Sequence, residues 1–289
     1  MRWGDLIRAG LVVAGLAAAG LAACASGNAS GFSVPRRSLE NQVALIAPHT
    51  TIRLPANAEG PVPAAILLHG CGGLRQVQPD YAADLLAAGY GVIIVDSNSA
   101  RRIGRFGAMS QVCTAMRLWG QERAADVEAA LEIARSDARI DAERLALIGW
   151  SHGGWTVLEA LDYAGENRMP PAIPDADARP LAGVRSAILV YPYCGFPVRA
   201  DGRGFPADIA IHALLAGGDL VAPPGDCRRL FDRAQAAGTP VDHVTWPGLT
   251  HAFDEPNQPP DPRMEYDAAA AARARARIVE ILDAAFDQG

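Results

Sequence analysis

The five residues Gly-Trp-Ser-His-Gly, from Gly149 to Gly153, have the pattern Gly-x-Ser-x-Gly, which could make Ser151 a nucleophile. In this pattern the serine occupies a strained turn between a strand and a helix, and the glycines allow the sharp bend and the close packing of the helix. The apolar segment 145–149 and the segment 155–160 suit that strand and that helix. The motif therefore predicts a serine hydroxyl that is presented to an electrophilic carbonyl carbon.

A serine hydroxyl is a weak nucleophile unless an imidazole removes its proton and an acid orients that imidazole. Asp219, in the run GGDL, and His251, in the run THAFD, each follow an apolar segment of strand length, and both come after Ser151. Asp219 could instead be a turn residue, with Asp226 as the reserve acid, and His251 could be structural. We predict that Ser151, His251 and Asp219 are the nucleophile, the base and the acid of a catalytic triad.

The negative oxygen that forms when a carbonyl is attacked needs backbone N–H donors. We expect one donor to be the amide of His152, which directly follows the nucleophile at the start of a helix. The other would be the amide of Cys71, in the run HGCGG after an earlier apolar segment. His69 would shape this loop, because it precedes Ser151 in the chain. This chemistry requires neither a metal nor a cofactor, and we expect neither.

A scaffold of alternating strands and helices must position these residues. The apolar runs predict strands at 64–69, 91–96, 145–149, 186–191, 209–216 and 241–246, and helices at 79–88, 122–136, 152–163, 224–237 and 264–286. Such an alternation indicates a parallel sheet covered on both faces. We also expect strands within 42–54 at an antiparallel edge, and a turn at 141–144. The stretches 97–120 and 165–182 would be functional loops or solvated surface excursions.

The composition excludes several chemistries. All 26 basic residues are arginine, so the chain has no lysine for a Schiff base, a Ser–Lys pair or a phosphate-binding loop. The formal charge of −6 argues against nucleic acid as a partner. Hydrophobic residues make up 50% of the chain, as in ordinary globular proteins. The length of 289 residues allows one large domain, which we expect over residues 41–289.

Residues 1–23 resemble a bacterial lipoprotein signal peptide. Two arginines precede an apolar stretch, residues 11–23, that is short and rich in small residues for a membrane span. The stretch ends in Leu-Ala-Ala before Cys24, which resembles the site where lipoproteins are cleaved and lipidated. We expect a polar tether over 24–40 and, because Ala25 rather than an aspartate follows, the periplasmic face of the outer membrane. An ordinary signal peptide with a coincidental cysteine is the alternative.

An exported chain lies in a compartment where disulfides persist. Apart from Cys24, the cysteines are Cys71, Cys113, Cys194 and Cys227, for which three pairings are possible. We prefer Cys71–Cys113 and Cys194–Cys227, because each pair would join loops at one edge of the expected sheet. Other pairings and free buried thiols are the alternatives.

The runs LLHGCGG, LIGWSHGG, AGGDLVAP and THAFD, in this order, resemble the dienelactone hydrolase family of α/β-hydrolases over nearly all of residues 60–289. The resemblance implies an α/β fold with a mostly parallel eight-stranded sheet and helices on both faces. It also implies cofactor-free cleavage of ester or lactone bonds by Ser151, Asp219 and His251. Two departures are visible. The namesake enzymes use a cysteine where Ser151 stands, and they carry a glutamate where Gly70 stands.

Several residues near the expected site could contact a small-molecule substrate. Tyr191 and Tyr193 end a strand, and Trp155 follows the nucleophile, although core packing is the default interpretation for Trp155. The cluster Arg101–Arg105 could meet an anionic substrate or be solvated. We expect a serine hydrolase that cleaves esters or lactones through an acyl-enzyme at Ser151. An exopeptidase, an acyltransferase or a non-catalytic lipoprotein that binds an envelope partner are the alternatives.

Overall fold

The computed structural model describes residues 34–177 and 179–287. The predicted signal peptide, Cys24 and most of the predicted tether lie outside these residues. From Arg36 onward the chain forms one structural unit. Across the described ranges, every helix is too short or too polar to span a bilayer.

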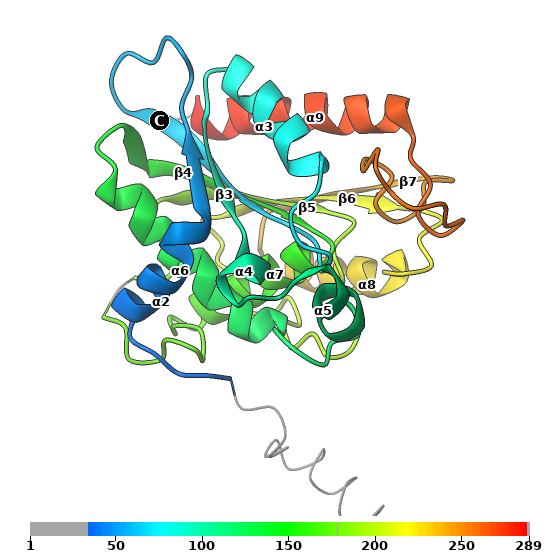
Figure 1. Cartoon of the computed structure of the whole chain (residues 1–289), viewed down its shortest axis with the longest axis horizontal. Coiled ribbons are helices and arrows are strands. Elements are labelled where there is room, and N and C mark those ends of the chain that lie inside the picture. The colour runs from blue at the N-terminus through cyan, green and yellow to red at the C-terminus, as the bar shows by residue number, and fades with distance from the viewer. Residues whose placement is uncertain (1–33, 178, 288–289) are drawn as a thin grey trace, which may run out of the picture. The chain divides into compact units, whose positions relative to one another are not determined.

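A seven-stranded sheet organises this unit, with the strand order β1-β3-β2-β4-β5-β6-β7 (Figure 1). All neighbouring strands are parallel except β1 and β3, which are antiparallel. The strands are β1 (Thr50–Arg53), β2 (Val62–Leu68), β3 (Gly91–Val95), β4 (Ile140–Trp150), β5 (Val184–Val190), β6 (Ala210–Ala216) and β7 (Val241–Trp246). The expected α/β architecture with a mostly parallel sheet is confirmed, but the described part of the chain has seven strands rather than the expected eight.

Helices cover both faces of the sheet, as expected (Figure 1). The main helices are α2 (Leu39–Ile46), α3 (Val77–Ala87), α6 (Gly120–Ser136), α7 (His152–Gly165), α8 (Pro224–Ala236) and α9 (Ala268–Phe286). Alternate strand residues feed two cores. Leu67 and Ile148 pack on the side of α3 and α9, whereas Ile66 and Leu147 pack on the side of α2, α6, α7 and α8. Strands that are buried on both faces explain why their sequences are continuously apolar.

The amino-terminal edge differs from the prediction of strands within 42–54. Residues 39–46 form helix α2, which Ser38 caps by accepting a hydrogen bond from the amide of Asn41. Leu39, Val43 and Ile46 recur at helical spacing, and all three pack on the core. A 3₁₀ turn, η1 (Ala47–His49), then leads into β1, so only the second half of the predicted stretch is the antiparallel edge strand.

Residues 141–144 belong to β4, although their sequence predicts a turn. Val62 pairs with Ile140 and Ala64 pairs with Leu145, so four residues of β4 lie opposite one residue of β2. The side chain of Asp141 accepts hydrogen bonds from Glu143 N and Arg144 Nε within this bulge. The polar residues that indicate a turn therefore stabilise a bulge inside a longer strand.

The insertion 97–120 contains short helical turns, namely α4 (Ser97–Ala100), α5 (Arg105–Gly107) and the π-helical η2 (Ala108–Val112). Ile103, Ala108, Val112 and Leu118 form a small core of its own. Arg101 points inward, where it forms ion pairs with two carboxylates of α6, Glu122 and Asp126. The arginines 101–105 therefore do not act as one cluster. Arg101 is a structural residue of the interior, whereas Arg102 and Arg105 are exposed. The other insertion, 165–182, consists of turns and irregular backbone after the end of α7 where it is described.

Both disulfides form in the pairing that we preferred. Cys71–Cys113 joins the loop after β2 to the residue after η2, and Cys194–Cys227 joins the loop after β5 to helix α8. Both bridges lie beyond the carboxyl ends of parallel strands. They therefore tie together the loops among which the candidate site is built.

Glu159 of α7 is a carboxyl group buried in the core. Its Oε1 accepts hydrogen bonds from Gln121 Nε2, Trp155 Nε1 and the amide of Arg199. Burial raises the pKa of Glu159 from 4.5 to about 7. Between these two values the folded protein holds a proton that the unfolded chain has released.

We expect the free energy of unfolding to fall as the pH rises from 4.5 to about 7, because the unfolded Glu159 ionises first. Relative to the wild type, Glu159→Gln should gain as much as about 3 kcal/mol of stability over this interval. Urea unfolding at both ends of the interval measures the difference. Glu132→Gln, on the surface of α6, is the matched control and should show no such gain. An identical pH dependence for Glu159→Gln and wild type would contradict the prediction.

Candidate active site

Ser151 occupies a strained turn between β4 and α7. Its backbone has φ 50° and ψ −111°, in a region that residues with a side chain rarely adopt. The flanking glycines are required by close packing. A Cβ on Gly149 would lie 2.5 Å from the carbonyl oxygen of Gly153, and a Cβ on Gly153 would lie 2.0 Å from that of Leu68. The predicted strand, turn and helix are therefore present, and they hold the serine at the carboxyl edge of the sheet.

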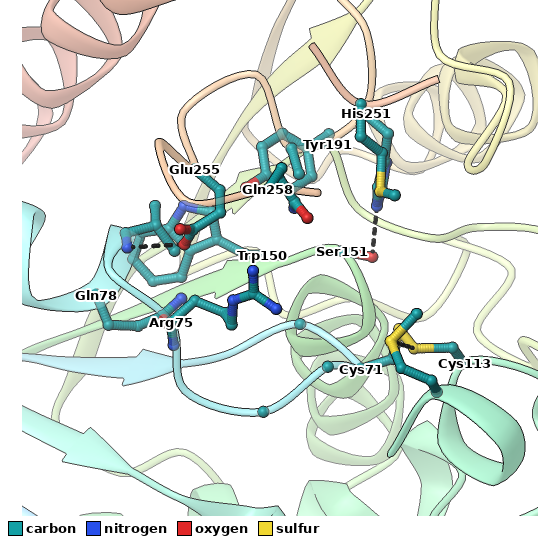
Figure 2. Close-up of a pocket in the computed structure, with 17 residues that line it drawn as sticks. Cys71, Arg75, Gln78, Cys113, Trp150, Ser151, Tyr191, His251, Glu255 and Gln258 are labelled. Atoms are coloured by element: carbon teal, nitrogen blue, oxygen red, sulfur yellow. Dashed lines mark hydrogen bonds between the residues drawn. A yellow bond between two sulfur atoms is a disulfide. The ribbon is translucent and has the colours of Figure 1, made fainter. Parts of the chain in front are cut away.

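The structure brings Ser151, His251 and Asp219 together in a hydrogen-bonded chain. His251 Nε2 lies 2.9 Å from Ser151 Oγ (Figure 2), and His251 Nδ1 lies 2.6 Å from Asp219 Oδ2. Since a carboxylate only accepts, Nδ1 donates to Asp219 and leaves Nε2 free to accept the serine proton. This is the geometry that activates a serine nucleophile.

Asp219 is fixed by the chain that follows it. Its Oδ1 accepts hydrogen bonds from the amides of Val221 and Ala222, at 2.8 and 2.7 Å. Asp219 is 4% exposed and His251 is 5% exposed, so water screens their interaction little. The reserve acid Asp226 instead forms an ion pair with Arg229 on the surface of α8. Asp219 is therefore the acid that faces the histidine.

The two backbone amides expected to hold an oxyanion are unpaired within the described residues. His152 begins α7, and the first amides of a helix have no acceptor within it. The amide of Cys71 lies in a loop that passes close to the nucleophile, since a Cβ on Gly70 would lie 3.6 Å from Ser151 Cβ. Cys71, Gly70 and Ser151 line the same pocket. The positive end of the α7 dipole adds to the attraction for a negative oxygen here.

A buried arginine that the sequence analysis missed connects these two amide donors. Arg123 of α6 is 0% exposed. Its Nη1 donates to the carbonyl of His69, at 2.7 Å, and to His152 Nδ1, at 3.1 Å, while Nε donates to Ser97 Oγ at 2.8 Å. One guanidinium group thus joins the loop after β2, the segment after β3 and the start of α7. The only sequence signal was a charged residue on the face of α6 that packs inward.

Arg123 also sets the protonation of the two histidines that it contacts. Burial lowers the pKa of Arg123 to about 10, so it stays charged at neutral pH. Burial and this charge lower the pKa of His152 to about 3, and they hold the pKa of His69 well below its usual value. Both rings are therefore neutral. His152 Nδ1 accepts from Arg123, and His251 rather than His152 lies within hydrogen-bond distance of Ser151 Oγ.

A second buried polar group, Asp254, braces the other side of the site. Its Oδ1 accepts from Tyr191 Oη at 2.5 Å, and its Oδ2 accepts from Tyr81 Oη at 2.7 Å and Trp150 Nε1 at 3.2 Å. Trp150 precedes Ser151, and the ring of Tyr191 packs edge-on against His251 with centroids 4.9 Å apart. Asp254 thus holds Trp150, which precedes the nucleophile, and Tyr191, which packs against the base. Burial raises the pKa of Asp254, and the three donors oppose that rise.

A pocket opens beside Ser151 (Figure 2). Its polar lining includes Arg75 from the loop after β2, Gln78 from the first turn of α3, and Glu255 and Gln258 from the loop after β7. Its apolar lining includes Tyr191 and three sulfur-containing positions, namely Met109, Met264 and the Cys71–Cys113 disulfide. The described residues contain no group of three or more side chains arranged to hold a metal ion.

Of the three residues predicted to contact a substrate, only Tyr191 lines this pocket. Trp155 is 1% exposed, and its ring fills the space beside Gly120, where a Cβ would lie 2.4 Å from Nε1. Tyr193 donates its hydroxyl hydrogen bond to the carbonyl of Phe196 and packs against Trp155. Trp155 is therefore a core residue, as its apolar ring and the buried partner Glu159 explain, and Tyr193 is not part of the pocket lining.

Two protein-family models match separate parts of the chain. The prolyl oligopeptidase family model matches residues 80–168, which include Ser151, and the dienelactone hydrolase family model matches residues 178–286, which include Asp219 and His251. No curated protein matches the chain.

Solved structures with this architecture are distant in sequence. A protein from Klebsiella pneumoniae, provisionally described as a dienelactone hydrolase, is 17% identical, with a TM-score of 0.63 over 81% of this chain and 91% of that one. A dienelactone hydrolase-like promiscuous phosphotriesterase from metagenomic libraries is 16% identical, with a TM-score of 0.60 over 82% and 99%. Thermogutta terrifontis esterase 2 is 14% identical, with a TM-score of 0.58 over 81% and 88%. The chain thus has the α/β-hydrolase fold, and its carboxyl-terminal part matches the dienelactone hydrolase family.

Proposed function

We propose that this protein is a serine hydrolase that cleaves carboxylic ester or lactone bonds through an acyl-enzyme at Ser151. The observation that carries the proposal is the chain of hydrogen bonds from Ser151 Oγ through His251 to Asp219, at 2.9 and 2.6 Å. Two backbone amides without a partner among the described residues, and a pocket that Ser151 and Cys71 both line, support acyl transfer.

In the proposed reaction, His251 Nε2 takes the proton of Ser151 as Oγ bonds to the ester carbon. The amides of Cys71 and His152 donate to the resulting oxyanion. When the tetrahedral intermediate collapses, the bond to the alcohol oxygen breaks and His251 returns the proton to that oxygen. A water molecule then attacks the acyl-enzyme with His251 again as base, which releases the carboxylic acid and restores Ser151.

An amide-cleaving activity is the second candidate. The match of residues 80–168 to the prolyl oligopeptidase family favours it, because this segment contains the nucleophile. The same triad could open a peptide bond, since fold and triad do not fix the substrate. A panel of p-nitrophenyl esters, small lactones and aminoacyl p-nitroanilides separates the two. The ester and lactone proposal fails if only the anilides are turned over.

We expect Ser151→Ala to lower kcat/KM for p-nitrophenyl acetate by at least about 10³-fold, since the nucleophile of the acyl transfer is lost. A fluorophosphonate probe should label the wild type at Ser151 and leave the variant unlabelled. Ser136→Ala, on an exposed serine at the end of α6, should match the wild type in both measurements. Undiminished ester hydrolysis by Ser151→Ala would falsify the proposed mechanism, and a folded wild type that takes up no probe would favour a non-catalytic binding role.

We expect Arg123→Met to lower kcat about 10²-fold with little change in KM, because the two oxyanion donors lose the group that aligns them. Arg123→Lys, which keeps a charge near His69 and His152, should recover part of this loss. Arg135→Met, on the half-buried side of the same helix, is the matched control. Thermal unfolding of each variant separates loss of fold from loss of rate. A folded Arg123→Met protein with wild-type kcat would show that Arg123 does not position the donors.

We further propose that Cys24 carries a lipid that tethers the protein to the periplasmic face of the outer membrane. The support is the signal-like sequence of residues 1–23 and the Leu-Ala-Ala that precedes Cys24. Cys24→Ser should move the protein from the membrane fraction to the soluble fraction, and metabolic labelling with palmitate should disappear. Unchanged fractionation and labelling of the variant would show that Cys24 is not the anchor.

A further inference from the structure

One segment beside the site combines exposed arginines with exposed apolar side chains. We call residues 102–117, which include α5 and η2, the rim segment. No aspartate or glutamate occurs between Ser97 and Gly120, although the whole chain has a net charge of −6. Arg102, Arg105 and Arg117 are exposed, and none of the three forms an ion pair with a described residue. The rim segment is therefore a locally cationic part of an acidic protein.

The same segment exposes large apolar side chains. Phe106 is 84% exposed, Met116 is 66% exposed and Met109 is 50% exposed. These residues are not needed to pack the segment, because Ile103, Ala108, Val112 and Leu118 already fill its interior. Apolar side chains gathered on a surface in this way typically mark an interaction site.

The rim segment forms one wall of the candidate active site. Met109 and Cys113 line the pocket beside Ser151, and the Cys71–Cys113 disulfide fixes the segment to the oxyanion loop (Figure 2). Two further exposed apolar residues come from loops at the same edge of the sheet. Phe196, after β5, is 90% exposed, and Leu220, directly after Asp219, is 74% exposed. A surface that contacts the rim segment would thus lie at the mouth of the pocket.

We propose that the rim segment docks on an anionic lipid surface and that the pocket accepts esters dissolved in that surface. The part of this proposal that names the substrate rests on the proposed hydrolase function, whereas the docking does not. Phe106 and the methionines would enter the boundary between headgroups and acyl chains, while the arginines would contact lipid phosphates. An anionic lipid surface matches both the exposed apolar side chains and the exposed arginines, because its acyl chains are apolar and its headgroups are negatively charged.

We expect the chain from residue 24 onward with Cys24→Ser, which lacks both the apolar stretch 11–23 and any attached lipid, to bind vesicles of phosphatidylcholine mixed with phosphatidylglycerol more tightly than vesicles of phosphatidylcholine alone. The pair Arg102→Glu and Arg105→Glu should weaken binding to the anionic vesicles at least about thirtyfold, since each arginine near such a surface is worth about fivefold. Phe106→Ser should weaken it about tenfold through the lost apolar contact. Flotation measures binding, and amide hydrogen exchange should slow within 102–117 when anionic vesicles are added.

The matched control is the pair Arg53→Glu and Arg185→Glu, which changes the net charge equally at exposed sites on the opposite edge of the sheet. It should keep wild-type binding and wild-type exchange. Equal losses from both pairs, or unchanged exchange in 102–117, would overturn the proposal. So would a wild-type dimer that Phe106→Ser dissociates, because the rim segment would then be a contact between copies of this chain.

The inactive Ser151→Ala variant separates this inference from the proposed function. It should bind anionic vesicles as the wild type does, because Ser151 lies inside the pocket. The rim variants should hydrolyse p-nitrophenyl acetate at the wild-type rate but hydrolyse an ester embedded in anionic vesicles at least about tenfold more slowly. Loss of both rates, or wild-type rates on both substrates, would refute the proposed substrate class, whereas flotation and hydrogen exchange decide the docking.

Discussion

The guanidinium of Arg123 is buried away from water, where an unpaired charge would be costly. Its hydrogen bonds go to the carbonyl of His69, the ring of His152 and the hydroxyl of Ser97. These acceptors belong to three segments that are distant in sequence. The cost of burying the charge is offset only when all three are in place. Arg123 therefore acts together with the Cys71–Cys113 disulfide to position the loop and the helix start beside Ser151.

Asp254 plays the corresponding part on the other side of the nucleophile. It accepts from Tyr81, Trp150 and Tyr191, which come from α3, β4 and the end of β5. A buried cation thus organises the oxyanion side of Ser151, and a buried carboxyl organises the histidine side. The strained backbone of Ser151 lies between two networks that each resist its relaxation.

Local sequence patterns predict much of the triad. The nucleophile motif, and the placement of Asp219 and His251 after successive strands, follow from short runs and from the rule that parallel strands end at one edge. The prediction of strands within 42–54 is wrong over helix α2, because the few apolar residues there fit the period of a helix and that of a strand. The contact between Gln42 and Asp126, which favours the helix, joins residues far apart in the sequence. The sequence does not show whether Trp155 is a core residue or contacts a substrate, because the position of its ring depends on the space that Gly120 leaves in the folded protein. Arg123 and Asp254 were missed as organisers because their partners are brought together only by folding.

The bridge between Cys71 and Cys113 makes the site depend on the compartment in which the chain folds. Cys71 supplies a candidate oxyanion amide, and Cys113 ends the turn η2 that forms a pocket wall. A cytosolic thiol pool keeps such cysteines reduced, whereas an oxidising compartment joins them. Under the export that we propose, maturation of the pocket would be coupled to transport. A chain that had not yet left the cytosol would have the residues of the triad but would lack the covalent link between Cys71 and Cys113.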